Sequence, residues 1–282
     1  GGWAETQAIR ASWYPSTVAS VSYACKVLLR EAMLQSCDTL DGLQFKLHDF
    51  GARAATSLES AGLGGLSHIV NFAGTDTITA IIAAARWYGM TRIEDMPAFS
   101  IPAAEHSTIT SWGNLEENEI DAYRNMIRCF GGTNNMFAVV SDGRDLFNAI
   151  EHLWGGVLRQ EVIDNGGVLV IRPDSGDPVE VVLKALRILG ERFGFTMNTK
   201  GYKLLPPYIR LIQGDGINWQ SLKRIIDAIL ADGWSLDNIA FGMGGGLLQL
   251  VSRDDESWAA KASSRANSQG DWFDFCKDPV TD

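Results

Sequence analysis

Short hydrophobic runs alternate with amphipathic stretches along most of the chain. Residues 168–171 (VLVI) form a β-branched and aliphatic run, which is typical of a strand buried on both faces. Asp177 then has the properties of a helix N-cap, Pro178 suits the first helical turn, and apolar residues recur after it at three- and four-residue spacing. The stretch 168–190 therefore predicts a strand, a polar loop and a helix.

The same strand, loop and helix unit recurs through the chain. Strand candidates occupy residues 45–51, 68–76, 99–106, 136–143, 168–171, 208–216 and 238–246, and helix candidates follow most of them. This alternation predicts a parallel sheet with helices outside it, and seven or more units favour a (β/α) barrel over an open doubly wound sheet. We expect a helical segment at 1–40, an α/β barrel-like core at 41–256 and an extension at 257–282.

Polar side chains gather where the strand candidates end. They are Asp49, Asp76, His106, Asp142, Arg172, Asp174 and Asp215. In a barrel the carboxyl ends of the strands share one face, and active sites are built on that face. The pattern therefore predicts that these residues, which lie far apart in the sequence, converge on one site.

Composition narrows the class of protein further. The chain has 282 residues, 46% of them hydrophobic, and its mean hydropathy of -0.02 indicates a globular protein with a large core. No apolar run approaches the ~20 residues of a membrane span, and a net charge of -10 argues against a nucleic-acid partner. Four scattered cysteines without a C-x-x-C pair argue against a zinc site or a disulfide framework. We expect a cytoplasmic protein with no nucleic-acid or membrane partner.

Glycines and arginines at the predicted face favour a phosphorylated ligand. Residues 242–246 (GMGGG) lie between a strand and a helix candidate, where bare backbone N–H groups can bind an anion, although a tight turn is the alternative. Arg53, Arg172 and Arg253 each follow a strand end closely. Arginine binds phosphate oxygens bidentately, but for any one of these arginines alone a surface ion pair is the commoner role.

Two aspartates favour a sugar as part of that ligand. Asp174 and Asp215 lie in glycine-containing loops and can accept hydrogen bonds from sugar hydroxyls. Capping the next helix is the alternative role, but Asp177 and Asn218 already fill those positions. Together with the arginines and glycines, the aspartates predict a site for a phosphosugar.

Six motifs, in order, resemble the type II phosphoribosyltransferases, and among them the members that use nicotinamide. The motifs are KLHDFGAR, NFAGTDT, IPAAEHSTITSWG, VIRPDSGDP, LLPPYIRLIQGDG and NIAFGMGGGLLQLVSRD. The resemblance runs from SWYP (12–15) to CKDPVTD (276–282) and implies a barrel-like phosphoribosyltransferase core with a remnant of a second, β-rich domain at the termini. Because the family has further segments on both sides, it also implies that this is the central part of a longer protein.

The resemblance implies a reaction and its participants. The phosphoribosyl group of 5-phosphoribosyl-1-pyrophosphate would pass to nicotinamide, giving nicotinamide mononucleotide and pyrophosphate in NAD salvage. Mg²⁺ would accompany the pyrophosphate, with metal ligands unassigned, and ATP is implied as a coupling substrate through phosphorylation of His106. A homodimer is also implied. A nicotinate-type phosphoribosyltransferase, or a non-catalytic nucleotide-binding relative, remains the alternative.

The resemblance also assigns roles to matching positions. His106, Asp174 and Arg172 would be catalytic, Phe50 would stack on the pyridine ring, and Asp76 would accept a hydrogen bond from the amide and repel nicotinate. The other substrate-binding residues are Arg53, His106 and Arg172 at the pyrophosphate, Asp174, Gly214 and Asp215 at the ribose, Gly244 and Gly245 at the 5′-phosphate, and Arg253 at the phosphate end of the nucleotide.

Overall fold

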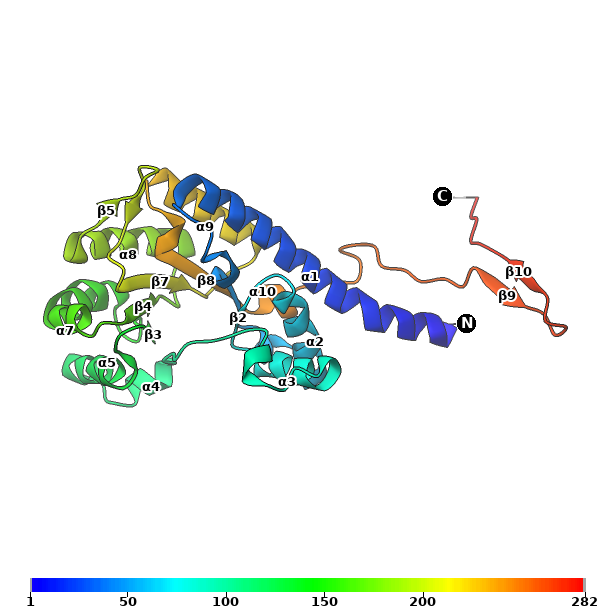
Figure 1. Cartoon of the computed structure of the whole chain (residues 1–282), viewed down its shortest axis with the longest axis horizontal. Helices are drawn as coiled ribbons and strands as arrows, with labels where there is room; N and C mark the ends of the chain where they lie inside the picture. The colour runs from blue at the N-terminus through cyan, green and yellow to red at the C-terminus, as the bar shows by residue number, and fades with distance from the viewer. Residues whose placement is uncertain (1, 281–282) are drawn as a thin grey trace.

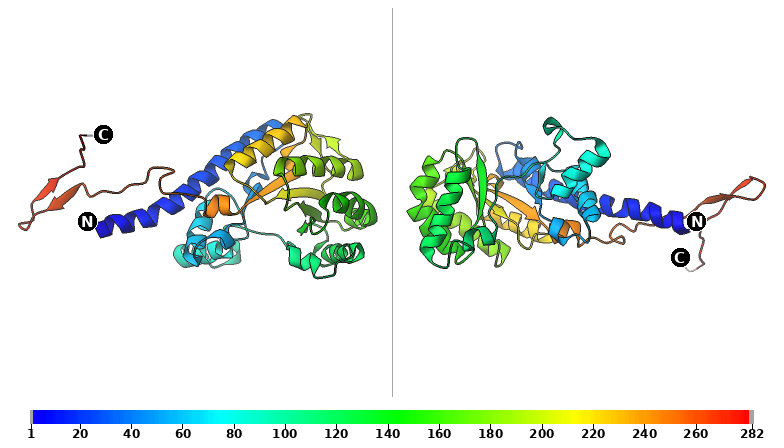
Figure 2. Two further views of the ribbon diagram at one scale, coloured as in Figure 1. Left: turned by 180° about the vertical axis from the view of Figure 1, so that it is seen from behind. Right: turned by 90° about the horizontal axis from the view of Figure 1, so that it is seen from below.

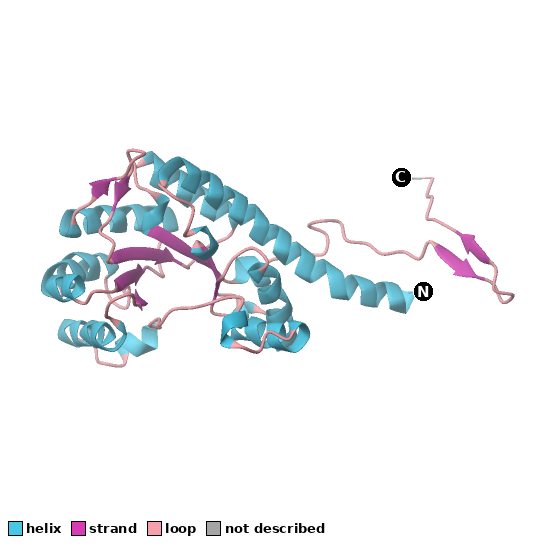
Figure 3. Cartoon of the chain, in the orientation of Figure 1, coloured by secondary structure: helices cyan, strands magenta, loops and turns pink. Residues whose placement is uncertain are grey.

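A computed structural model describes residues 2–280 and has a parallel sheet of six strands at its centre (Figure 3). The strands are β1 (Leu47–Asp49), β2 (Gly74–Thr75), β3 (Met136–Val140), β4 (Val168–Arg172), β7 (Ile209–Gln213) and β8 (Ile239–Met243). Their order in space is β2-β1-β8-β7-β4-β3, and each neighbouring pair is parallel. The predicted α/β class with a parallel sheet is confirmed.

The segment 99–104 connects the two edges of this sheet. It forms one parallel bridge from Phe99 to Gly74, beside β2, and another from Ala103 to Ala138, on β3. The sequence pattern predicts a full strand here, whereas the structure has an extended segment held by single bridges. The ring of strands is therefore barrel-like, with this segment in the position of the seventh strand.

Helices cover the outside of the strand ring (Figure 1). They are α1 (Gly2–Ser36), α2 (Leu58–Ile69), α3 (Ile78–Tyr88), α4 (His106–Thr110), α5 (Glu116–Phe130), α6 (Leu146–Asn148), the π-helix η4 (Ala149–Val157), α7 (Arg159–Asp164), α8 (Pro178–Phe193), α9 (Trp219–Ala231) and α10 (Gly245–Leu248). Short 3₁₀ turns are η1 (Leu43–Phe45), η2 (Ala52–Ala54), η3 (Ile93–Asp95) and η5 (Leu236–Asn238). Their buried apolar faces form the main core with the outward side of the strands.

Two of these helices begin as the sequence predicts. The Asp177 carboxylate accepts the N–H groups of Val179 (3.0 Å) and Glu180 (3.1 Å) at the start of α8. Asn218 accepts the N–H of Ser221 at 2.9 Å at the start of α9. Both caps satisfy N–H groups that have no acceptor within the helix.

The strand predicted at 68–76 is mostly wrong. Helix α2 continues to Ile69, and the strand is limited to Gly74–Thr75. His68 is fully buried, with Nδ1 2.9 Å from Ser22 Oγ and Nε2 3.2 Å from the Leu47 carbonyl oxygen. A short apolar run fits a buried helix end as well as a strand, and its periodicity alone does not separate them.

Both ends of the described chain leave the body of the molecule. The first turns of α1 extend outward, and the C-terminal hairpin of β9 (Ser264–Ala266) and β10 (Trp272–Asp274) lies on the same side (Figures 1 and 2). A second antiparallel pair joins β5 (Thr196–Met197) to β6 (Lys203–Leu204).

In the described part of the chain, no helix is both long and apolar enough to span a membrane. Residues 1 and 281–282, the latter within the CKDPVTD motif, lie outside the described residues, and the predicted domain boundaries stay predictions.

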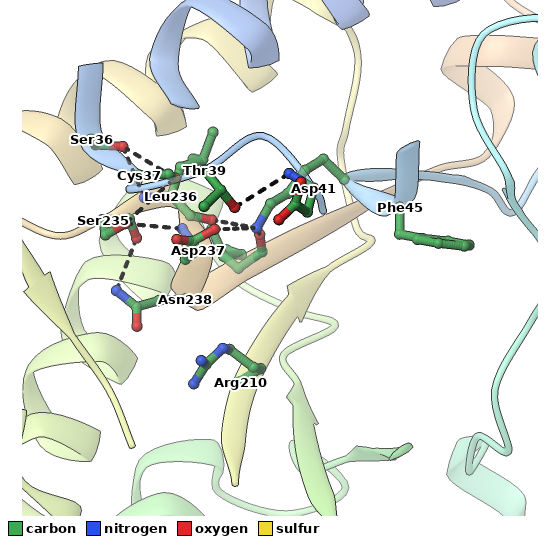
Figure 4. Close-up of polar contacts among 12 residues, drawn as sticks. Ser36, Cys37, Thr39, Asp41, Phe45, Arg210, Ser235, Leu236, Asp237 and Asn238 are labelled. Carbon is green, nitrogen blue, oxygen red and sulfur yellow. Dashed lines mark hydrogen bonds and ion pairs between the residues drawn. The ribbon is translucent and has the colours of Figure 1, made fainter. Parts of the chain in front are cut away.

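Polar contacts tie the end of α1 to the amino-terminal end of β8 (Figure 4). Ser36 Oγ accepts the N–H of Leu236 at 3.1 Å, and Ser235 Oγ contacts Cys37 Sγ at 3.5 Å. The buried Lys46 ammonium donates to the carbonyl oxygens of Leu236 (2.7 Å) and Ile239 (3.0 Å). These contacts fix one end of the strand ring and leave the carboxyl ends of the strands to form the site.

Candidate functional site

A cavity of about 470 Å³ lies at the carboxyl ends of the parallel strands. Its lining residues are Phe50, Ala52, Arg53, Ala54, Asp76, Thr77, Glu105, Arg172, Asp174, Gly214, Asp215, Gly216, Ile217, Asn218, Gly244, Gly245, Gly246 and Leu250. All of the predicted catalytic and substrate-binding residues except His106 and Arg253 are among them. The strand-end residues Asp49 and Asp142 are not, and Asp49 is fully buried, where it accepts the N–H of Gly51 at 2.7 Å. The structure therefore brings together residues from six separate segments, as a barrel face requires.

Two glycines give the Phe50 ring its position. A Cβ atom at Gly242 would lie 2.0 Å from the ring, and one at Gly214 would lie 3.0 Å from it. The first distance is too short for a side chain and the second is a tight contact, so the ring packs directly against the backbone of β8 and of the loop after β7. The first glycine of the 242–246 run thus makes room for Phe50, a role that the sequence analysis did not assign.

Gly245 has different surroundings from Gly242 and Gly214. A Cβ atom there would meet nothing closer than the Ala54 methyl group at 3.8 Å, which is an ordinary contact. As the first residues of α10, Gly245 and Gly246 have N–H groups that no preceding helical turn accepts. Packing against the described residues therefore does not require a glycine at 245.

Arg172 is held at the end of β4 by two carboxylates. Its Nη2 lies 3.1 Å from Asp174 Oδ2 and 3.2 Å from Glu105 Oε2, while Nη1 lies 3.4 Å from Glu105 Oε1. Burial disfavours the charge, but these two carboxylates outweigh burial and raise the pKa of Arg172 above its ordinary value. Its Nε is buried and has no partner within residues 2–280. Three of the five guanidinium N–H groups are thus engaged, which leaves the Nε–H and one N–H of Nη1 for a ligand.

His106 lies beside the cavity wall and is tied to it through aspartates. Its Nε2 is 2.9 Å from Asp142 Oδ1, and its Nδ1 is 3.8 Å from Asp174 Oδ2. The other Asp142 oxygen accepts the N–H of Asp174 at 3.2 Å. Asp142 therefore orients both the imidazole ring and the Asp174 loop.

Three residues of the site had no assigned role in the sequence analysis. They are Glu105, which binds Arg172, Asp142, which binds His106, and Ser100, whose hydroxyl donates to Asp76 Oδ1. Glu105 and Asp142 lie at the ends of strand candidates, and this position in the sequence indicated that they belong to the site. Ser100 had no such signal, because its contact with Asp76 depends on how segment 99–104 passes β2.

Arg253 is not brought to the cavity. Its guanidinium is exposed and pairs with the neighbouring Asp254, with Nη2 2.7 Å from Oδ1. Its predicted contact with a phosphate group stays a prediction.

A second cavity of about 610 Å³ continues into the strand ring. It shares Phe50, Asp76 and Arg172 with the first cavity. Much of its wall is apolar and includes Ile101, Ala103, Ala138, Val170, Ile212 and Ala240. This space was not predicted from the sequence. The feature of the sequence that indicates this space is alanine at mid-strand positions, where larger side chains usually fill a barrel interior.

The polar groups do not form a protein cage for a metal ion. Among the described residues, no cluster of three or more histidine, cysteine, aspartate or glutamate side chains could hold one. Asp142 has both oxygens engaged, and Asp174 Oδ2 faces Arg172. This donor set fits a Mg²⁺ ion that binds mainly through substrate phosphates and takes one or two carboxylates, with Asp174 and Asp215 as the candidates.

Comparison with known proteins gives relatives along most of the chain. The model of the nicotinate phosphoribosyltransferase (NAPRTase) family matches residues 45–282. The chain is 52% identical over 271 residues to a nicotinamide phosphoribosyltransferase of Xanthomonas campestris pv. campestris (strain 8004), covering 96% of this chain and 56% of that protein. It is 30% identical over 290 residues to one of Acinetobacter baylyi (strain ATCC 33305 / BD413 / ADP1), with the same two coverages, 96% and 56%. The chain thus spans about half the length of the curated relatives it matches.

The fold is shared with a solved structure at low sequence identity. The nicotinate-nucleotide pyrophosphorylase of Pyrococcus furiosus superposes with a TM-score of 0.52 at 13% identity, over 83% of this chain and 47% of that chain. This similarity confirms the predicted barrel-like phosphoribosyltransferase fold. With the family match over residues 45–282, it follows that the chain belongs to the nicotinate phosphoribosyltransferase (NAPRTase) family.

Proposed function

We propose that this chain carries the site of a nicotinamide phosphoribosyltransferase, which transfers the phosphoribosyl group of 5-phosphoribosyl-1-pyrophosphate to nicotinamide in NAD salvage. The observation that carries the proposal is the position of Phe50, Asp76 and Arg172, where a polar cavity meets an apolar one. A polar phosphosugar and a flat aromatic amide would meet at that junction. The relatives named above support the choice of reaction.

The nicotinamide would bind at the junction of the cavities. Its ring would stack on Phe50, its amide N–H would donate to Asp76, and its carbonyl oxygen would accept the unpartnered Nε–H of Arg172. A nicotinate carboxylate would instead face the Asp76 carboxylate at close range, and this repulsion favours the amide.

The phosphosugar would occupy the polar cavity. Arg53 and Arg172 would bind the pyrophosphate, and Gly214 and Asp215 would bind the ribose hydroxyls. The N–H groups at Gly244–Gly246 would bind the 5′-phosphate. On the family resemblance, Arg253 would approach the phosphate end of the nucleotide.

The reaction would be a displacement at the anomeric carbon of the ribose. The lone pair of the pyridine nitrogen forms the new C–N bond, and the C–O bond to pyrophosphate breaks with its electrons leaving on oxygen. Holding both substrates in line converts the reaction into an effectively unimolecular step. Asp174 and Asp215 would stabilise the positive charge that develops on the ribose, and the arginines would stabilise the leaving group. Bound Mg²⁺ would neutralise part of the pyrophosphate charge.

Three further properties are proposed on the family resemblance. ATP would phosphorylate His106, whose ring Asp142 already orients, and couple hydrolysis to synthesis. The protein would act in the cytoplasm as a homodimer. Large apolar side chains exposed around α2 and α3, namely Leu58, Ile78, Ile82 and Tyr88, support an interface between copies.

A direct assay tests the proposed function. The chain is incubated with 5-phosphoribosyl-1-pyrophosphate, Mg²⁺ and either nicotinamide or nicotinate, and mononucleotide is quantified by chromatography. We expect nicotinamide mononucleotide, with nicotinate a much poorer substrate. A preference for nicotinate would support the nicotinate-type alternative. Binding of mononucleotide without any turnover would support the non-catalytic alternative.

A further inference from the structure

The Nη1–Nη2 edge of Arg172 is already occupied by Glu105, and both residues line the cavity. The two Glu105 oxygens lie 3.4 Å from Nη1 and 3.2 Å from Nη2, which is the paired arrangement that a phosphate group would also adopt. The Arg172 side chain is 9% exposed, whereas that of Glu105 is 57% exposed. Arg172 is therefore the fixed partner, and Glu105 is the partner that is free to rotate into solvent.

Glu105 is charged in this position. Burial disfavours its charge, but the hydrogen bond and charge of Arg172, together with the charges of Arg53 and His106, outweigh burial and lower the pKa of Glu105. The charged form of Glu105 is thus stabilised by Arg53 and Arg172, the two arginines that line the cavity. The second carboxylate on Arg172, that of Asp174, is 19% exposed and belongs to the loop that Asp142 holds.

A pyrophosphate group and the Glu105 carboxylate cannot share one edge of a guanidinium, because both are negative and both need the same N–H groups. We propose that Glu105 is an internal anion that occupies the phosphate-binding edge of Arg172 in the empty site and is displaced when pyrophosphate or its phosphoribosyl ester binds. The inference rests on the proposed function, since that function puts pyrophosphate on Arg172. Glu105 is a positioning residue: it holds Arg172 in the empty site and weakens the hold on the pyrophosphate product.

The backbone of Glu105 allows this exchange. The preceding residue, Ala104, is buried, and its N–H donates to the Ala138 carbonyl oxygen at 2.9 Å. Glu105 itself precedes the first residue of α4 in an extended conformation. Rotation about side-chain bonds would therefore free Arg172 without moving segment 99–104.

The test is the affinity for inorganic pyrophosphate, measured by calorimetry in the presence of a chelator and again with Mg²⁺. Glu105→Gln keeps the shape of the side chain and removes the competing charge. We expect it to bind metal-free pyrophosphate about 5- to 30-fold more tightly than the wild type. The matched control is Glu117→Gln, which makes the same charge change at an exposed position of α5 outside the cavity and should bind like the wild type.

Thermal unfolding separates displacement from a purely structural role. Without anion, Glu105→Gln should unfold at a lower temperature than the wild type, because Arg172 has lost a partner. Pyrophosphate should then raise its unfolding temperature by more than it raises that of the wild type. In turnover, KM for the phosphoribosyl substrate should fall by a similar factor, and kcat should not rise, because pyrophosphate leaves more slowly.

Equal or weaker pyrophosphate binding by Glu105→Gln would overturn the inference. So would a loss of affinity seen only with Mg²⁺, which would make Glu105 a metal ligand. If the chain forms mononucleotide but the variant gains no affinity, the inference alone fails. If no mononucleotide forms but the variant binds pyrophosphate more tightly, the inference stands and the proposed function fails. Absence of pyrophosphate binding by both proteins overturns both.

Discussion

Asp76 and Gly245 both line the polar cavity. Substituting either residue tests one half of the proposed substrate complex. Asp76 follows β2, and its carboxylate accepts the Ser100 hydroxyl. Gly245 begins α10, and a Cβ atom there would make only an ordinary contact with the Ala54 methyl group at 3.8 Å. The first would recognise the amide of the base, and the second would allow the 5′-phosphate to approach the backbone.

Replacing Asp76 by asparagine should reduce the preference for nicotinamide over nicotinate. Asparagine no longer repels a carboxylate, and it can turn its own NH₂ toward one. We expect the ratio of kcat/KM values for the two substrates to fall about tenfold or more, which corresponds to ~1.4 kcal/mol or more. Asp95→Asn, at an exposed position of η3 outside the cavity, is the control for the change in charge. An unchanged ratio in Asp76→Asn would contradict the role given to Asp76.

Replacing Gly245 by alanine should impair binding of the phosphosugar without impairing folding. The new methyl group fits the protein, since its closest neighbour lies at 3.8 Å, but it would stand where the phosphate approaches. We expect KM for 5-phosphoribosyl-1-pyrophosphate to rise about fivefold or more, with an unfolding temperature within about 2 °C of the wild type. Gly242→Ala is the contrasting variant, because its methyl group would collide with Phe50 and should lower stability. A wild-type KM in Gly245→Ala would argue against a phosphate at this position.

The starts of α8 and α9 were predictable from the sequence. The caps at Asp177 and Asn218 lie where the sequence predicts them, because a cap depends on residues close in sequence. The prediction failed at 68–76, where the apolar run ends a buried helix. The length of α2 there depends on contacts of His68 with Ser22 and Leu47, and these distant partners leave no local signal.

Removing the cap of α8 tests this element directly. Asp177→Ala leaves the N–H groups of Val179 and Glu180 without their acceptor, which should destabilise the chain by ~1 kcal/mol and lower its unfolding temperature by about 2–4 °C. Asp177→Asn retains an acceptor oxygen and should stay close to the wild type. Substrate affinity should be unchanged in both, since Asp177 does not line the cavity. Equal stability of the two variants would show that the cap does not contribute.

The alternation of strands and helices in the sequence is enough to predict the architecture of the molecule, but it is not enough to predict its cavities. The rule that strand carboxyl ends share one face was enough to predict that Arg172, Asp215 and Gly245 line one site. The rule does not say which side chains touch. Contacts such as Glu105 with Arg172 join residues 67 positions apart, and the space inside the strand ring arises from the combined small size of Ala103, Ala138 and Ala240. These features depend on packing in three dimensions.

Global stability should depend on pH through the buried His68. Burial lowers the pKa of His68 from 6.5 to about 4 in the folded chain. The unfolded chain therefore binds the proton more readily between these values, and His68 makes folding less favourable as pH falls through this window, by at most ~1.4 kcal/mol per pH unit. Burial raises the pKa of Asp49 to about 6, which acts in the opposite direction over an overlapping range, so the net change in the wild type is partly cancelled.

A variant isolates the contribution of His68. His68→Gln should be destabilised at pH 7, where it lacks the contacts of the neutral imidazole. The difference in unfolding free energy between wild type and variant should shrink as pH is lowered from 6.5 toward 4, as measured by denaturant unfolding. A difference that stays constant across this range would show that the imidazole does not remain neutral in the folded chain.

The most direct test of the account is a crystal structure of the chain with nicotinamide mononucleotide, pyrophosphate and Mg²⁺. The proposed site predicts the pyridine ring against Phe50, the amide nitrogen at Asp76, the ribose at Asp215, the 5′-phosphate on the N–H groups of Gly245 and Gly246, and the pyrophosphate on Arg172. Mononucleotide bound outside this cavity, or a complex in which Arg172, Asp215 and Gly245 do not contact the bound molecules together, would contradict it.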